Sequence, residues 1–473
     1  MSDAVLAIDQ GTTATKALVV AVDGTVLADA EQPVPVHATG DGAVEIHPGD
    51  LWESVVSAGR AALASAGVPV RAVGLANQGE SVLAWDQTTG EALTPCLVWQ
   101  DRRSAQICAD LRPAGDRLAA ISGLRLDPYF SAPKMRWIRD RMTGDGVVTT
   151  TDTWLLHRLT GEFVTDVSTA SRSMLLDVDT LEWSDEAWEL FGLDEARPRL
   201  ARSDETIGAT GAFGDTVPVG GIIVDQQAAL WAQGARERGQ SKCTYGTGAF
   251  LLANTGDTPT RSLAGLATSV AWRLAGQARY CLDGQLYAVG AAFAWLNRLG
   301  LLAGAHEIEA VLTATPHSGG VVFVPALAGL GAPHWQPDAR AAFLGMSLST
   351  TREHLVRAVC ESIAAHVAEL AGTVAAELSQ PLTTLRVDGG LTRSPAFLQL
   401  QADVAGVPVV ACHSPHATAF GVADLAARTA YGHGIAEVPS AAAVEPRARA
   451  GWATELIGRW RTAVTLTSNW STL

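Results

Sequence analysis

Two short turns carry glycines and hydroxyl side chains that suit a phosphate group. They are 11–13 (GTT) and 246–248 (GTG), and each follows an apolar segment. A tight glycine turn lets backbone N–H groups approach an anion closely, and the threonines add hydroxyl donors. A Gly-Thr turn between strands is more often a plain hairpin, so neither turn alone establishes a phosphate site. Asp9 lies just before the first turn. Its carboxylate could hold Mg²⁺ through water or could cap the turn, and the sequence favours both interpretations equally.

Three further segments place polar groups where a cleft could use them. Asp225 follows the apolar run 221–224 (GIIV). Its carboxylate could accept a hydroxyl proton during phosphoryl transfer, or it could simply cap a helix over 226–234. The segment 388–390 (DGG) ends a strand before a helix, which favours a nucleotide contact, although a structural turn is the plainer interpretation. The segment 99–103 (WQDRR) joins an aromatic face to polar groups, which suits a polyhydroxylated ligand.

The elements that position these residues repeat in the two halves of the chain. Apolar runs predict strands at 4–10, 15–22, 25–30 and 70–76, and helical periodicity predicts a helix over 50–66 capped by Asp50. The second half repeats the strand–turn–strand unit, with expected elements at 242–248, 249–255, 385–390, 394–405 and 407–410. Alternating strands and helices indicate an α/β fold. We therefore expect two duplicated domains facing a cleft, at 1–234 and 235–473.

Composition narrows the function classes. The chain has 473 residues, 48% of them hydrophobic, and a formal net charge of -15. This charge disfavours nucleic-acid binding, which needs a basic surface. The six cysteines form no Cys-x-x-Cys pair and are expected to be reduced. The first residues lack a signal-peptide pattern, and no apolar run is long enough to span a bilayer. We expect a soluble cytoplasmic protein without a membrane partner.

Taken in order, the motifs resemble those of the FGGY carbohydrate kinases and, within them, the glycerol kinases. The resemblance extends from Leu6 to about Gly432, through the segments 8–13 (IDQGTT), 98–103 (VWQDRR), 131–138 (SAPKMRWI), 151–156 (TDTWLL), 225–229 (DQQAA), 244–256 (TYGTGAFLLANTG), 333–340 (PHWQPDAR) and 385–391 (LRVDGGL). It implies two ribonuclease H-like domains of the actin and hexokinase type. It also implies that ATP, Mg²⁺ and a small polyol or sugar meet in the cleft, where a substrate hydroxyl is phosphorylated.

The resemblance assigns roles residue by residue. Asp225 corresponds to the catalytic base and Asp9 to the acid near the metal. Positions matching the substrate pocket are Gly79, Glu80, Trp99, Tyr129, Asp225, Gln226 and Phe250. Positions matching the nucleotide site are Thr12, Thr13, Lys16, Thr247, Gly290, Gly390 and Ser394.

Departures from the family pattern concern the substrate. Glycerol kinases carry Arg before the pocket glutamate, and this chain has Gly79 there; Val224 stands where the family usually has Gly. Losing the Arg removes a bulky cationic donor and leaves space, so a substrate larger than glycerol is expected. A true glycerol kinase with a rearranged pocket is the alternative within the enzyme class.

An alternative of another class is a catalytically silent sugar-sensing protein on the same fold. Keeping Asp9, Thr13, Asp225 and Thr247 together argues against it. The sequence leaves the oligomeric state open, with a homodimer among the possibilities.

Overall fold

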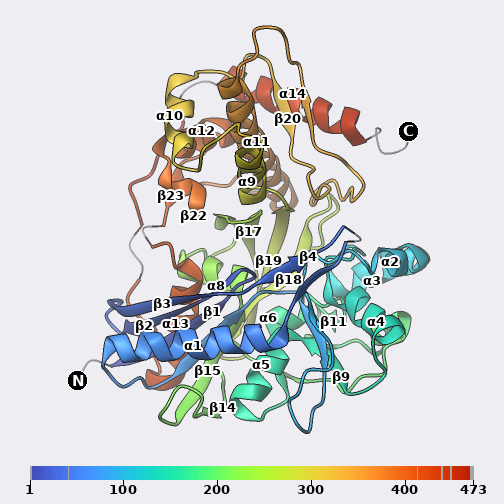
Figure 1. The fold of residues 1–473 in the computed structure, drawn as a ribbon, viewed down its shortest axis with the longest axis vertical. Helices are drawn as coiled ribbons and strands as arrows, with labels where there is room; N and C mark the ends of the chain where they lie inside the picture. The colour runs from blue at the N-terminus through green and yellow to red at the C-terminus, as the bar shows by residue number, and fades with distance from the viewer. Residues whose placement is uncertain (1–2, 41, 413, 438–439, 448–449, 469–473) are drawn as a thin grey trace.

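The computed structural model describes residues 3–40, 42–412, 414–437, 440–447 and 450–468, in two halves stacked along the long axis (Figure 1). The N-terminal half is built on a six-stranded sheet. Its strand order is β14 (Thr206–Thr210), β15 (Val217–Val224), β6 (Val73–Asn77), β1 (Ala4–Gln10), β2 (Ala14–Ala21) and β3 (Val26–Pro33).

The C-terminal half has a second six-stranded sheet. Its order is β18 (Ala267–Leu274), β19 (Gln277–Leu286), β17 (Ala249–Gly256), β16 (Ser241–Tyr245), β22 (Leu385–Gly389) and β23 (Val409–Ala411). In each sheet the first strand in chain order pairs antiparallel with the second and parallel with a later one: β1 pairs with β2 and β6, and β16 pairs with β17 and β22. This shared topology confirms the predicted α/β architecture of two duplicated domains.

Smaller sheets complete the fold. A five-stranded sheet in the N-terminal half has the order β4 (Val36–Ala38), β5 (Val44–Ile46), β8 (Cys96–Leu97), β7 (Val82–Trp85) and β9 (Val147–Thr150). Three two-stranded sheets pair β10 (Val164–Asp166) with β13 (Arg199–Ala201), β11 (Leu176–Asp177) with β12 (Glu182–Trp183), and β20 (Val322–Val324) with β21 (Ala342–Leu344).

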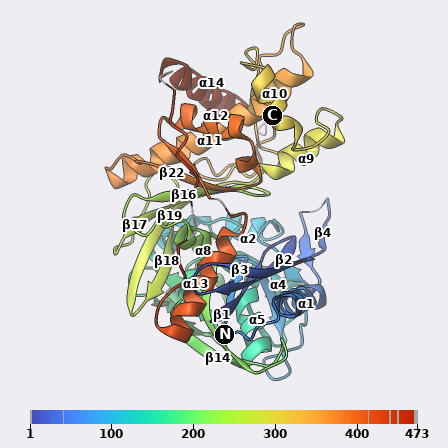
Figure 2. The same ribbon diagram turned by 90° about the vertical axis from the view of Figure 1, so that its left-hand side faces the viewer.

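The helices fall into two groups. Those of the N-terminal half are α1 (Pro48–Ala66), α2 (Ala105–Asp110), α3 (Gly115–Ser122), α4 (Ser131–Arg141), α5 (Thr151–Thr160), α6 (Val167–Ala170), α7 (Asp185–Phe191) and α8 (Asp225–Ala232). Those that follow are α9 (Gly290–Arg298), α10 (Glu307–Ala314), α11 (Arg352–Leu378), α12 (Pro395–Ala405), α13 (Ala417–Tyr431) and α14 (Ala450–Ser468). Helices α9 to α12 and α14 gather on the far side of the C-terminal sheet, so that sheet faces the N-terminal half (Figures 1 and 2).

Helix α1 begins earlier than predicted. Its N-cap is His47, whose side chain accepts a hydrogen bond from Gly49 N, and Pro48 occupies the first turn. Proline suits this place because its missing N–H would have no partner inside the helix. The prediction of Asp50 as the cap is therefore wrong, and Asp50 lies inside the first turn, where an acid still favours the positive end of the helix dipole.

Helix α13 returns from the C-terminal half to pack on the N-terminal sheet. It contacts α8, β15, β1 and β6, and both views place it beside α8 and β1 (Figures 1 and 2). Glycine makes the approach possible, because a Cβ at Gly421 would lie 2.0 Å from the carbonyl oxygen of Ala228, and one at Gly74 would lie 2.9 Å from Val422. Helix α13 lies in the predicted C-terminal domain, 235–473, but it packs into the core of the N-terminal half.

Helix α11 is the core helix of the C-terminal half. Among the described residues it is the one helix long and apolar enough to cross a membrane, and 83% of its most apolar window is buried inside the structure. Because it contacts β17, β19, β20, α12 and α14, its apolar surface is used in packing within this half.

We predict that Gly421→Ala destabilises the fold by about 1–3 kcal/mol, because its methyl group would force α8 and α13 apart. Urea unfolding followed by circular dichroism measures this change. Gly372→Ala is the matched control, since it adds the same methyl group to α11, where a Cβ meets nothing within 4 Å. The control is expected to be neutral or stabilising by up to about 1 kcal/mol. Equal effects of the two substitutions would contradict the close-packing argument.

Candidate active site

A cavity of about 140 Å³ lies between the two halves. All residues predicted for the substrate pocket line it, together with three of those predicted for the nucleotide: Thr12, Thr13, Gly79, Glu80, Trp99, Tyr129, Asp225, Gln226, Thr247 and Phe250. The lining comes from both halves, because it includes residues that follow β1 and β6 in one sheet and residues where β16 ends and β17 begins in the other. The duplicated topology therefore brings the two Gly-Thr turns to face one cavity.

The other predicted residues lie outside the lining within the described chain. Asp9 and Lys16 are cross-strand partners on β1 and β2, beside the first turn. Gly290 begins α9, its N–H donates to Gly246 O at 3.0 Å, and a Cβ there would lie 2.8 Å from the same oxygen. Gly390 follows β22 and opens a short 3-10 helix. Asp9 and Lys16 therefore lie on the two strands that the first turn joins, and Gly290 contacts the second turn.

Ser394 has a local structural role. It is the N-cap of α12, its hydroxyl accepts from Phe397 N at 3.1 Å, and it donates to Glu309 Oε2 at 2.5 Å. Both bonds are made within the C-terminal half, which accounts for its residue type without a ligand.

Thr12 is oriented by an aromatic side chain. The indole Nε1 of Trp99 donates to Thr12 Oγ1 at 2.9 Å. Because the hydroxyl oxygen accepts this bond, its own proton can be directed at an acceptor in the cavity.

Aromatic rings form the apolar wall. Trp99 meets Tyr129 edge-on with centroids 5.7 Å apart and meets Phe250 edge-on at 5.8 Å. Phe250 comes from the C-terminal half and the other two from the N-terminal half, so this wall crosses the cleft. Such rings suit the carbon face of a small ligand whose hydroxyls are held by polar groups.

Asp225 stands at the start of α8, directly after β15. Burial, with smaller contributions from the neighbouring charges of Asp9 and Glu80, raises the pKa of its carboxyl to about 7, although Lys242 opposes this. Its Oδ1 accepts a hydrogen bond from Gln226 N at 2.7 Å. A carboxyl with a pKa near neutrality can accept a proton from a substrate and release it again.

Asp9 lies in a second acidic environment beside it. Burial raises the pKa of its carboxyl to about 6, Lys16 lowers it, and Asp388 and Glu31 raise it again. Asp388 comes from β22 of the opposite sheet, and its Oδ1 has no hydrogen-bond partner in the part of the chain that the structure describes. A divalent cation would relieve this repulsion, and carboxylate oxygens are the ligands that Mg²⁺ prefers.

Lys242 was not singled out in the sequence. Its ammonium group donates to Gln226 Oε1 at 2.6 Å and to Thr244 Oγ1 at 2.9 Å. It therefore fixes the side-chain amide of Gln226 next to Asp225. A lysine in the interior of β16, in an otherwise uncharged strand, is the signal that could have identified it.

Arg172 is a second residue of the cavity that was not predicted from the sequence. It follows α6, lines the cavity, and is 3% exposed. Its Nε donates to Glu80 Oε1 at 2.6 Å, its Nη2 lies 2.8 Å from Asp283 Oδ2, and its Nη1 donates to Ser269 Oγ at 2.6 Å. Glu80 belongs to the N-terminal half, and Asp283 and Ser269 to the C-terminal half. Its signal in the sequence is a lone charge in the uncharged run 167–176.

Glu80 has a strained backbone, with a φ of 59°. Non-glycine residues in this region cost about 1–3 kcal/mol and gather at functional sites. The bond from Arg172 holds the carboxylate in place, and burial raises its pKa while Arg172 lowers it.

The wall beside Glu80 is filled by Val224. A Cβ at Gly79 would lie 3.0 Å from Val224 Cγ2. The expectation that Gly79 simply leaves space is therefore wrong in part, because a methyl group occupies the position next to it. On the same side, the Nε2 of Gln78 has no hydrogen-bond partner among the described residues, so the cavity offers an unused amide donor.

Comparison with known proteins agrees with this geometry. Residues 4–232 match the N-terminal domain, and residues 241–430 the C-terminal domain, of the FGGY family of carbohydrate kinases. The chain is 44% identical to a glycerol kinase of Thermus brockianus over 88% of each chain, and 41% identical to one of Alkalilimnicola ehrlichii over 99% of each. The structure of Plasmodium falciparum glycerol kinase with ADP has a TM-score of 0.89 at 27% identity, over 98% of both chains. The protein therefore belongs to the FGGY family of carbohydrate kinases and is an enzyme of the glycerol-kinase-like type.

Proposed function

We propose that this kinase transfers the γ-phosphoryl group of ATP to a hydroxyl of a small polyol or sugar with more than three carbons. The observation that carries the proposal is the position of Asp225, a carboxyl with a pKa of about 7, between two hydroxyl-bearing turns from opposite halves. A base tuned near neutrality and a pair of phosphate-binding turns are the two requirements of transfer to an alcohol.

In this proposal Asp225 takes the proton of the substrate hydroxyl. Lys242 and Gln226 fix the groups around it, so the carboxylate keeps its orientation during transfer. Glu80 and the amide of Gln78 hold neighbouring substrate hydroxyls, while Trp99 and Phe250 exclude water from the reacting atoms.

Thr12 and Thr247 are proposed to donate to phosphate oxygens from opposite sides of the cavity. Asp9 and Asp388 would hold Mg²⁺, directly or through water. When bound, MgATP supplies the phosphoryl group and neutralises the charge that develops in the transition state.

Two positions of the pocket differ from the glycerol-kinase pattern, one by a smaller residue and one by a larger residue. The pattern has an arginine at position 79 and a glycine at position 224, where this chain has Gly79 and Val224. An arginine at 79 would begin 3.0 Å from the valine methyl, so the valine and the arginine side chain compete for one place. We propose that the exchange replaces a hydrogen-bonding wall by an apolar one, which relaxes the requirement for a three-carbon ligand.

Glycerol is the second candidate substrate. The relatives named above are glycerol kinases, and Arg172 brings a guanidinium group to the cavity in this chain. Arg172 is already bonded to three partners, Glu80, Ser269 and Asp283. We therefore propose that Arg172 positions Glu80 and does not replace the arginine missing at position 79. For this reason we propose the longer substrate rather than glycerol.

We place the division between the domains at 234/235, within the gap between the two family matches, with α13 as the element that crosses back. We also retain a cytoplasmic location, which the buried character of α11 allows.

The first experiment is a substrate panel with coupled ADP detection, comparing glycerol, erythritol, pentitols and pentuloses. We predict a higher kcat/KM for a four- or five-carbon substrate than for glycerol. A clear preference for glycerol would contradict the longer substrate and leave the kinase assignment intact. No ADP release with any member of the panel would favour a silent protein instead.

We predict that Asp225→Asn lowers kcat by about 10²–10⁴-fold, because an amide keeps the shape but cannot accept the proton. Binding of ATP, measured by calorimetry, should stay within a few-fold of the unmodified enzyme. In the unmodified enzyme kcat/KM should fall on the acidic side with an apparent pKa near 7, since the base must be ionised.

Stability gives an independent check on the same carboxyl. Its pKa is raised from 3.8 to about 7, so the folded state holds a proton that the unfolded chain releases. This contribution makes the unmodified protein lose stability as the pH rises from about 4 to about 7, and Asn removes that slope. Near-full activity of the variant, or an unchanged slope, would show that Asp225 is not the base described here.

A double-mutant cycle tests the wall at positions 79 and 224. Gly79→Arg alone should be poorly accommodated because of the valine methyl group, whereas Gly79→Arg with Val224→Gly should accept the arginine and shift the preference toward glycerol. We expect a coupling of about 0.5–3 kcal/mol in the kcat/KM for glycerol, typical of residues in contact. Additive effects of the two substitutions would refute the proposed competition for one place.

A further inference from the structure

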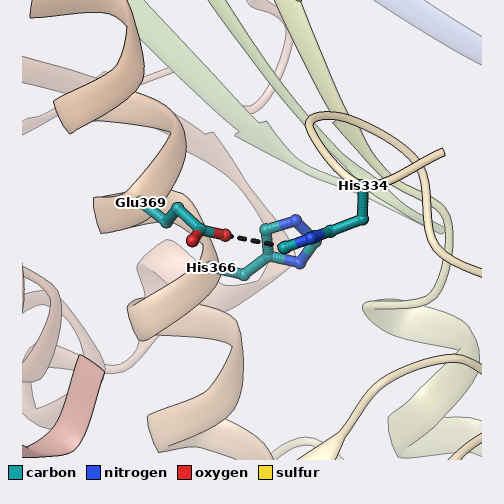
Figure 3. Close-up of side chains that lie close together, drawn as sticks. All are labelled: His334, His366 and Glu369. Atoms are coloured by element: carbon teal, nitrogen blue, oxygen red, sulfur yellow. Dashed lines mark hydrogen bonds and ion pairs between the residues drawn. The ribbon is translucent and has the colours of Figure 1, made fainter. Parts of the chain in front are cut away.

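Three side chains away from the cavity form a cluster of possible metal ligands. His334 lies in the loop between β20 and β21, and His366 and Glu369 lie one turn apart on α11 (Figure 3). Each offers one ligand atom, and these atoms lie within 4.8 Å of one another. The i and i+3 spacing places the two helical residues on one face of α11, where such pairs bind metals in helical proteins.

His366 is the observation that points to a ligand. It is 1% exposed, and its Nε2 lies 2.9 Å from the carbonyl oxygen of Ala332. Because a carbonyl only accepts, Nε2 carries the proton and Nδ1 has a lone pair. This Nδ1 is buried without a hydrogen-bond partner among the described residues. A histidine that binds a metal commonly donates its other N–H to a backbone carbonyl in this manner.

The other two ligands are close to suitable positions. His334 Nε2 lies 2.9 Å from Glu369 Oε2, while Glu369 Oε1 accepts from Arg461 Nε at 2.8 Å. Bonds of 2.0–2.1 Å in a tetrahedral site set ligand atoms about 3.3 Å apart, and the three candidate ligand atoms lie within 4.8 Å of one another in the metal-free structure. A metal-free chain of hydrogen bonds from His334 through Glu369 to Arg461 would explain two of the residues, but it leaves Nδ1 of His366 unpaired.

We propose that His334, His366 and Glu369 bind a divalent transition metal such as Zn²⁺, with three protein ligands and one open position. Two imidazoles and one carboxylate favour Zn²⁺, Co²⁺ or Ni²⁺ over Mg²⁺, which prefers oxygen ligands. The proposal is independent of the phosphoryl-transfer function.

The metal would tie a loop that reaches the other half of the molecule. Trp335, next to His334, donates from Nε1 to Gly265 O at 2.5 Å, and its ring lies 6.1 Å from that of Phe130 in the N-terminal half. Phe130 follows Tyr129 of the cavity wall. Fixing His334 on α11 therefore restrains a contact beside the active site.

The test is calorimetric titration of the chelator-treated, full-length protein with ZnCl₂ in excess MgCl₂, repeated with Co²⁺ and visible absorption. We expect one Zn²⁺ per chain and a ligand-field spectrum typical of Co²⁺ bound by nitrogen. His366→Gln, which can still donate to Ala332, should weaken Zn²⁺ binding by about tenfold or more. His334→Gln, on a loop, should do the same without disturbing α11.

His317→Gln is the matched control, because His317 stacks on His354 at 6.0 Å outside this cluster. It should leave Zn²⁺ affinity unchanged. Absence of stoichiometric Zn²⁺ binding, or equal affinities in the unmodified protein and in both cluster variants, would overturn the proposal. An equal loss in the His317 variant would also overturn it, since the binding would then be nonspecific.

Discussion

The buried ion triad of Glu80, Arg172 and Asp283 is the interaction on which the arrangement of the two halves depends. Its members are each 5% exposed or less, and the two acids come from opposite halves of the molecule. Removing one partner from such a group leaves an uncompensated buried charge, at a cost of about 3–5 kcal/mol. The triad also joins the two halves at the cavity, because all three residues line it.

The same burial explains the electrostatics of the site. Asp9, Asp225 and Asp388 lie near one another in the cleft, and burial raises the pKa of each. Lys242 is the cation that lowers the pKa of Asp225 and Asp388. A cleft with more buried carboxyls than buried cations is suited to a ligand that brings its own divalent cation. The acidity of the cleft and the proposed use of MgATP are thus consequences of one arrangement.

Much of the fold could be predicted because its signals are local. Apolar, β-branched runs such as 4–10 and 15–22 correspond to β1 and β2 within one or two residues, and the Gly-Thr turns separate strands as expected. What could not be predicted depends on distant contacts. The return of α13 to the N-terminal sheet needs Gly421 to lie against Ala228, and no local pattern shows that pairing. The cap of α1 moved to His47 because Pro48 is better suited to a first turn than to the preceding loop.

The site residues were also predictable only where the signal in the sequence is local. Residues in the Gly-Thr turns and at strand ends could be named from sequence. Lys242 and Asp283 lie within buried strands and Arg172 lies in the buried turn after α6, and there a lone charge does not show which partner it faces. Only the topology shows that Arg172 reaches Glu80 and Asp283 together.

Val224 illustrates how such contacts set specificity under the proposed function. A Cβ at position 79 would lie 3.0 Å from Val224 Cγ2, and we propose that the valine takes the place of an arginine side chain there, which makes the wall next to Asp225 apolar instead of cationic. An arginine there would lower the pKa of Asp225 and Glu80, because an adjacent positive charge favours the carboxylate form. Its absence leaves burial as the dominant influence on both groups. The exchange at positions 79 and 224 therefore connects the shape of the pocket to the basicity of the residue proposed to activate the substrate.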